Sequence, residues 1–158
     1  MLPTRLVRHD AVVSGRIYSV GYEGMTVEAL VDRLAGAKVT TLIDVRLNPI
    51  SRKPGFSRKR LTEALGNAAI EYVHERELGN PAANRDSFRD GDGQAGRRHM
   101  RKLLSNGSGP ALDRLVERAM GERIAVLCVE REQDRCHREV IIEMALEKNS
   151  AIEVIQIL

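Results

Sequence analysis

Residues 123–129 read RIAVLCV and form the most apolar stretch of the chain, and the mostly charged residues 130–138, EREQDRCHR, follow directly. A short run of branched aliphatic residues is typical of a strand buried on both faces, as the strands of parallel sheets are. Beyond the charged segment, Val140, Ile141 and Met144 recur at helical spacing. The stretch therefore predicts a strand, a polar loop and a helix, the repeating unit of an α/β fold.

The same alternation of strand and helix extends toward the N-terminus. Thr26 and Ser57 are suited to begin helices, because a hydroxyl there accepts an amide hydrogen bond from the first turn. The predicted strands cover residues 17–20, 39–45, 70–73, 123–129 and 151–158, with helices between them. Such strands pair in parallel through right-handed crossovers. We therefore expect an α/β fold: a single domain with a mainly parallel sheet of about five strands and helices on both faces.

Two segments lack a clear period. Residues 1–15 are predicted to form a flexible N-terminal leader, ahead of an α/β domain that covers residues 16–158. Residues 75–96 are rich in Gly, Asn, Asp and Arg, and a stretch of this length without periodicity is usually a functional or a disordered loop.

Composition excludes several classes of protein. Three Tyr, two Phe and no Trp are too few to bind single-stranded nucleic acid by stacking. A net charge of +3 falls short of a dedicated duplex binder but suits an anionic ligand. No apolar run approaches the roughly 20 residues of a membrane helix. The first residues do not form a secretory signal, and two cysteines are too few for a disulfide framework, so a cytoplasmic location without membrane contact is expected.

Polar clusters follow four of the predicted strands. They lie at residues 21–24, 44–52, 74–79 and 130–138. Ligands of open parallel sheets bind at the carboxyl ends of the strands, so these segments are expected to meet at one edge.

The last of these clusters predicts an anion site. Asp134 is suited to begin a helix, which would put Arg135, Cys136, His137 and Arg138 in its first turn. Free amides and the helix dipole there favour an anion, which Arg138 would grip in bidentate fashion. The same field would lower the pKa of Cys136 below its ordinary value of about 8.5.

The cluster after residue 43 offers two readings of Asp44. Asp44 and Arg46 are two apart at a strand end and therefore share one side, either as a buried ion pair or with Asp44 as a general base. Basic residues then gather in the loop and suggest an anion or nucleic-acid contact: Arg46, Arg52, Lys53, Arg58, Lys59 and Arg60.

Cys128 and Glu130 are two residues apart at the end of a predicted strand, so their side chains point to the same side. Glu130 is a second candidate acid or base. Cys128 itself is expected to be a small buried hydrophobe. Cys128, Glu130, Cys136 and His137 could together form a zinc site, but this reading is not favoured, because no CxxC pair is present and adjacent ligands in one helical turn point about 100° apart.

Several motifs resemble the domain of unknown function 488 family. The resemblance covers roughly residues 17–158 and includes Tyr18-Ser-Val-Gly21, Asp44-Val-Arg46 followed by Pro49 and Ser51-Arg52, Leu78-Gly79, and Cys128-Val-Glu130 with Cys136-His-Arg138. It implies a compact α/β domain, but no activity, cofactor or partner.

The residues indicate an enzyme acting on an anionic substrate such as a nucleotide or a nucleic-acid phosphate, as a hydrolase or transferase. Asp44, Glu130, Cys136 and His137 are the candidate catalytic residues; Gly21, Arg46, Ser51, Arg52 and Arg138 are the candidate anion contacts. Two alternatives stay open: a non-catalytic module that binds nucleic acid or protein, and a thiol-based redox protein that uses Cys136. The sequence identifies no cofactor and no oligomeric state.

Overall fold

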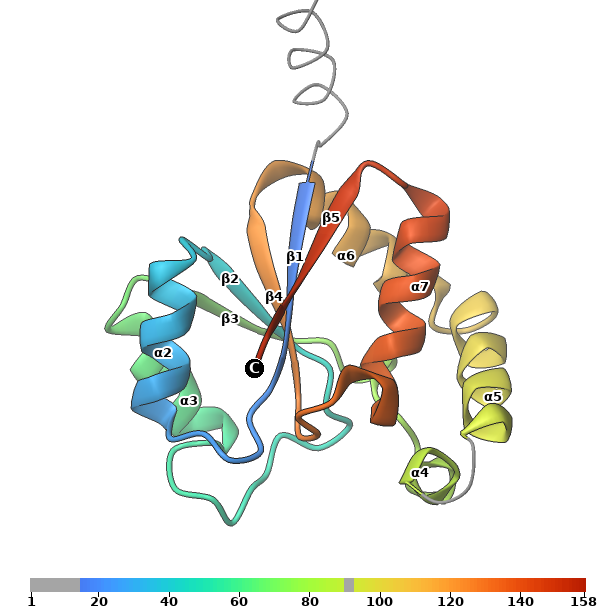
Figure 1. Ribbon diagram of the computed structural model, residues 1–158, viewed down its shortest axis with the longest axis horizontal. Helices are drawn as coiled ribbons and strands as arrows, with labels where there is room; N and C mark the ends of the chain where they lie inside the picture. The colour runs from blue at the N-terminus through green and yellow to red at the C-terminus, as the bar shows by residue number, and fades with distance from the viewer. Residues whose placement is uncertain (1–14, 90–92) are drawn as a thin grey trace, which may run out of the picture.

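The computed structural model describes residues 15–89 and 93–158. Five parallel strands form one sheet in the order β3-β2-β4-β1-β5 (Figure 1). The strands are β1 (Gly15–Gly21), β2 (Thr41–Asp44), β3 (Glu71–His74), β4 (Arg123–Cys128) and β5 (Ile152–Ile157). The predicted α/β class is confirmed. The predicted leader, up to residue 14, lies outside the described residues.

Six α-helices cover the two faces of the sheet within the described residues (Figure 1). One face carries α2 (Val27–Gly36) and α3 (Arg58–Gly66). The opposite face carries α4 (Ala82–Arg89), α5 (Gln94–Ser105), α6 (Gly109–Gly121) and α7 (Arg138–Lys148). None of the helices in these ranges combines the length and the apolar character that a membrane span requires.

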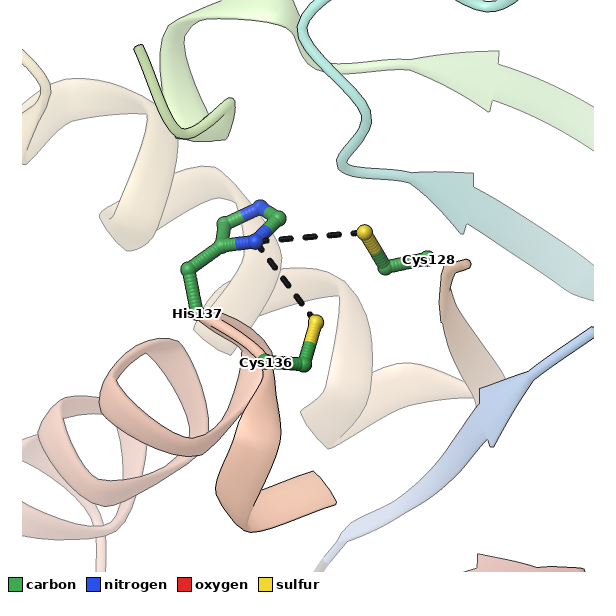
Figure 2. A group of neighbouring side chains, drawn as sticks. All are labelled: Cys128, Cys136 and His137. Carbon is green, nitrogen blue, oxygen red and sulfur yellow. Dashed lines mark hydrogen bonds between the residues drawn. The ribbon is translucent and has the colours of Figure 1, made fainter. Parts of the chain in front are cut away.

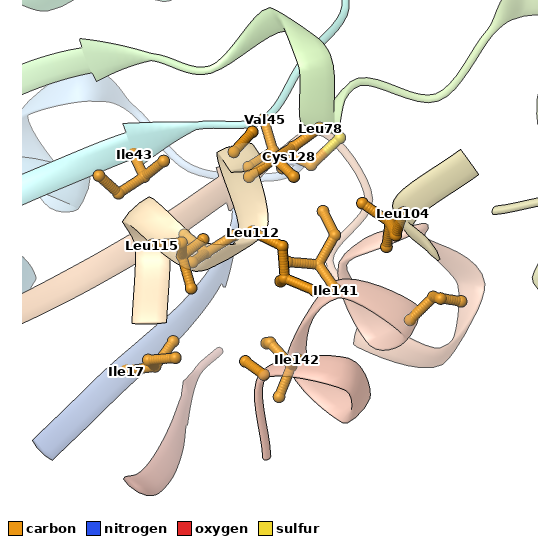
Figure 3. Close-up of a cluster of buried hydrophobic side chains, with 14 of the residues drawn as sticks. Ile17, Ile43, Val45, Leu78, Leu104, Leu112, Leu115, Cys128, Ile141 and Ile142 are labelled. Atoms are coloured by element: carbon orange, nitrogen blue, oxygen red, sulfur yellow. The ribbon is translucent and has the colours of Figure 1, made fainter. Parts of the chain in front are cut away.

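Alternate residues of the central strands supply two separate hydrophobic cores. In β4, Ala125 and Leu127 face α2 and α3. Ile124, Val126 and Cys128 face the other core, which Figure 3 shows with Leu112 and Ile141. Successive side chains of a strand point to opposite faces, so a strand covered on both faces needs an unbroken apolar run. This requirement explains the composition of residues 123–129.

The segment predicted to be a long loop contains two short helices. A 3-10 helix covers Arg76–Leu78 and α4 covers Ala82–Arg89, with α5 starting at Gln94. Asn84 and Phe88 are buried in α4, and the Asn84 side-chain amide donates hydrogen bonds to Asn80 and Gly96. The prediction of a structureless stretch was wrong because α4 is mostly polar and therefore shows no visible apolar period.

Gly21, at the end of β1, is in close contact with the loop that follows β4. A Cβ atom at this position would overlap the Glu130 carbonyl. The amides of the next two residues, Tyr22 and Glu23, donate to the carbonyls of Cys128 and Val129, and this pairing holds the two backbones together. Glycine is therefore required here for backbone approach.

We expect Gly21→Ala to lower the free energy of unfolding by about 3 kcal/mol or more, because both clashing partners are backbone. Gly36→Ala is the matched control, since nothing lies within 4 Å of a Cβ there and alanine is the better helix former. Urea unfolding of both variants checks this. Equal stability of the two variants would contradict the close approach at Gly21.

Candidate functional site

The carboxyl ends of β1, β2 and β4 remain hydrogen-bonded to one another beyond the strands. In addition to the contacts of Tyr22 and Glu23 with the end of β4, the Val45 amide donates to the Leu127 carbonyl over 3.1 Å. The polar segments that follow these strands therefore start side by side, as the parallel topology predicts.

A buried ion pair lies at the end of β2. Arg46 Nη2 is 2.7 Å from Asp44 Oδ2, and Arg46 Nε donates to Asp44 Oδ1 over 2.9 Å. The Tyr72 hydroxyl also donates to Asp44 Oδ2, over 2.6 Å. Arg46 Nη1 donates to the Phe56 carbonyl over 2.7 Å, which fixes the far end of the basic loop. These contacts correspond to the ion-pair reading of Asp44.

The pKa shifts of Arg46 and Tyr72, which both contact Asp44, agree with a buried ion pair. Burial opposes the charge of Arg46, but hydrogen bonding to Asp44 outweighs it and raises the pKa of the guanidinium above its ordinary value. Burial, and then hydrogen bonding to Asp44, raise the pKa of Tyr72. Arg46 thus stays cationic and Tyr72 stays a proton donor to the carboxylate.

The loop after β4 differs from the sequence-based prediction. Gln133–Arg135 forms a short 3-10 helix, Cys136 is extended with φ −132° and ψ 150°, and α7 begins at Arg138 with His137 as its N-cap. Asp134 does not begin this helix, so Arg135 and Cys136 lie outside its first turn. The Glu139 amide donates a hydrogen bond to the Cys136 carbonyl, and the Val140 amide donates one to the His137 carbonyl. The expected array of free amides is therefore not formed.

Cys128, Cys136 and His137 form a buried cluster, which we call the thiol–imidazole cluster (Figure 2). His137 Nδ1 lies 3.8 Å from Cys128 Sγ and 3.6 Å from Cys136 Sγ. The three potential ligand atoms all lie within 4.8 Å of one another. Cys128 is buried as predicted, but its sulfur also belongs to this polar cluster. Both thiols are free.

The backbone holds the cluster in place. His137 Nε2 is 2.9 Å from the Val45 carbonyl, which only accepts hydrogen bonds, so Nε2 carries the proton and donates. The Arg138 amide donates to Cys136 Sγ over 3.4 Å. The Cys128 thiol faces Glu130 Oε1 at 3.9 Å.

The members of the cluster shift one another's pKa. Burial opposes ionisation of Cys136, but a hydrogen bond from Cys128 and the charges of His137 and Arg138 outweigh it, so the pKa of Cys136 falls well below its ordinary value. The hydrogen bond with Cys136, together with burial, raises the pKa of Cys128. Burial disfavours charge on His137, yet the Cys136 thiolate raises the pKa of the imidazole. The pKa of Cys136 is thus lowered chiefly by its neighbours Cys128, His137 and Arg138.

A cavity of about 120 Å³ opens beside the cluster. Its lining includes polar and apolar residues: Arg46, Leu47, Asn48, Ile50, Asn80, Arg85, Phe88, Cys128, Val129, Glu130, Arg135, Cys136 and His137. Arg85 and Arg135 are the exposed arginines of this lining.

The structure brings together four of the sequence-predicted residues at this cavity: Arg46, Glu130, Cys136 and His137. The other predicted residues are not part of its lining. Asp44 is fully buried in its ion pair, and Gly21 contacts the Glu130 backbone. Ser51 Oγ accepts the Lys53 amide, and Arg52 is exposed.

Arg138, which the sequence predicts to contact the anion, is buried and bound to the backbone instead. Its side chain is 1% exposed, and its Nη2 donates to the carbonyls of Glu130 and Arg131. It therefore secures the loop that carries the cluster.

Sequence reasoning missed Arg85, Asn80 and Phe88 as cavity residues, because they belong to the segment without periodicity. For Arg135, the sequence predicts only a place in a helix turn. The unusual density of Asn and Arg in residues 75–96 was the signal that could have pointed to these residues.

Comparisons with known proteins identify the family of the chain. No curated protein and no solved structure matches the chain. A family profile, domain of unknown function DUF488, matches residues 26–145, which include β2, β3, β4 and all three residues of the thiol–imidazole cluster. The chain therefore belongs to the DUF488 family.

Proposed function

We propose that the protein is an enzyme acting on a small anionic group, which binds in the cavity beside the thiol–imidazole cluster. One observation carries this proposal: a buried group of two thiols and an imidazole lines a cavity whose lining also includes three arginines, Arg46, Arg85 and Arg135. Clefts that combine reactive side chains with charged groups are typical of active sites.

Arg85 and Arg135 are the anion contacts in this proposal. Both are exposed and line the cavity, so an anion can reach them. Arg46 lines the cavity too, but its guanidinium is engaged by Asp44 and Phe56. Arginine suits this role because its planar donors match the oxygens of phosphate or carboxylate.

The volume of the cavity bounds the substrate. The cavity, at about 120 Å³, is small. Sites for drug-sized ligands measure about 300–1,000 Å³. A phosphate-sized group therefore fits, whereas the rest of a nucleotide would lie outside, near the exposed side chain of Ile50.

Glu130 is the acid or base in this proposal. Its carboxylate is half-buried, lines the cavity and faces the Cys128 thiol. Asp44 takes a positioning role instead, because its oxygens accept hydrogen bonds from Arg46 and Tyr72.

We expect Arg135→Ala and Arg85→Ala each to weaken the binding of an aryl phosphate by about tenfold or more, since a hydrogen bond to a charged group contributes about 1.5–3 kcal/mol. Titration calorimetry measures the affinity. The control is Arg52→Ala, which removes an exposed charge outside the cavity lining.

The same three variants test the alternative of a nucleic-acid binding module. Backbone binding weakens steeply with salt and depends on the basic loop. If Arg52→Ala weakens salt-dependent binding of a short oligonucleotide while Arg135→Ala leaves aryl phosphate binding unchanged, the enzyme proposal is overturned.

Glu130→Gln is expected to lower the turnover of a chromogenic aryl phosphate by about 10²–10⁴-fold with little change in its binding, because glutamine keeps the shape but transfers no proton. Glu132→Gln is the control, as Glu132 is exposed in the same loop and not part of the cavity lining. Equal turnover rates for the two variants would exclude Glu130 as the acid or base of the reaction.

A second candidate function is thiol–disulfide exchange, which the proximity of the two sulfurs favours. A small-molecule disulfide would take two electrons and two protons from Cys128 and Cys136 and leave as two thiols, with one S–S bond formed in the protein. We expect mass spectrometry to show the loss of two hydrogens in the native chain and none in Cys128→Ala. An unchanged native mass in a strongly oxidising buffer excludes this function.

A further inference from the structure

The thiol–imidazole cluster has the donors of a transition-metal site. Cys128 comes from the end of β4, whereas Cys136 and His137 precede α7, and Figure 2 shows the three side chains pointing toward one another. All three are buried. Thiolate sulfur and imidazole nitrogen together are the ligands that zinc prefers.

The distances of the histidine nitrogen from the two sulfurs are close to those of a tetrahedral zinc site. Bonds of about 2.3 Å to sulfur and 2.0–2.1 Å to nitrogen, at a tetrahedral angle, separate the two ligand atoms by roughly 3.5–3.6 Å. The observed separations of His137 Nδ1 are 3.6 Å from Cys136 Sγ and 3.8 Å from Cys128 Sγ. Small movements of the side chains would therefore complete the site.

The surroundings orient these donors for a metal. Because His137 Nε2–H donates to the Val45 carbonyl, the Nδ1 lone pair of the neutral ring faces the sulfurs. A backbone carbonyl on the far nitrogen of a metal-ligating histidine is a common arrangement, which fixes both ring orientation and tautomer. The Arg138 amide supports negative charge on Cys136 Sγ.

One of the two objections raised by the sequence, the divergence of adjacent ligands, does not hold in the structure. Adjacent ligands diverge when both lie in one helical turn. Cys136 is instead extended and His137 is the N-cap, so neighbouring residues direct their donor atoms to one point.

We infer that Cys128, Cys136 and His137 bind one Zn²⁺ ion, with the fourth coordination position facing the cavity. Two thiolates balance the charge of the ion, and three protein ligands with one open position are typical of catalytic rather than structural zinc. The inference rests on the proposed function in one respect: zinc at this position would polarise the oxygen of an anionic substrate or of a water beside Glu130.

Metal binding to the full-length protein tests this inference without any substrate. After removal of metal by a chelator, zinc is added back and the bound zinc is measured by elemental analysis after gel filtration. We expect about one zinc per chain in the native protein and in His99→Ala, whose histidine is exposed on α5. Cys128→Ala and Cys136→Ser should each bind zinc at least about tenfold more weakly.

Cobalt substitution guards against variants that fail to fold. Cobalt bound to the native protein should give a thiolate-to-metal charge-transfer band and visible bands of a tetrahedral site. Absence of these bands, or full zinc retention by Cys136→Ser, overturns the inference. The aryl phosphate binding by Arg85 and Arg135 is measured separately, so failure of either proposal leaves the other standing.

Discussion

The ion pair between Asp44 and Arg46 is the interaction on which the site depends. It lies within the protein, with both side chains almost fully buried, and removal of one partner from such a pair leaves an uncompensated charge. The pair fixes the backbone that follows β2, whose next two carbonyls accept hydrogen bonds from His137 and His74. Two histidines from distant parts of the chain are thus oriented by one short segment.

The chemistry of the site is continuous with the hydrophobic core. Cys128 packs in the same core as Val126 and Ile141, and its sulfur also reaches His137. Well-packed surroundings hold side chains in single rotamers, which is the condition for a precise arrangement of reactive groups. The packing of the apolar strand β4 therefore also positions the reactive groups of the charged loop that follows it.

The sequence predicted the fold class and the meeting of polar segments, because both follow from apolar runs that alternate with helical periods. It did not predict the strand order, since β2 and β4 pair across a long crossover that leaves no local signal. It placed Cys136 on a helix turn, because Asp134 resembles an N-cap. This prediction was wrong because the path of the charged loop is set by contacts such as those of the Arg138 side chain with the Glu130 and Arg131 carbonyls. The cluster with Cys128 depends on that path.

The position of β1 in the sheet has a consequence for biosynthesis. Both of its neighbours, β4 and β5, come from the far part of the chain: Arg16 pairs with Arg123, and Gly15 pairs with Ile152. During translation, the first strand thus emerges from the ribosome long before either neighbour exists. Pairing over such separations slows folding and leaves apolar segments exposed meanwhile. The hydrogen-bonding groups and apolar side chains of β1 consequently stay without their native strand partners until residues 123–157 have been synthesised.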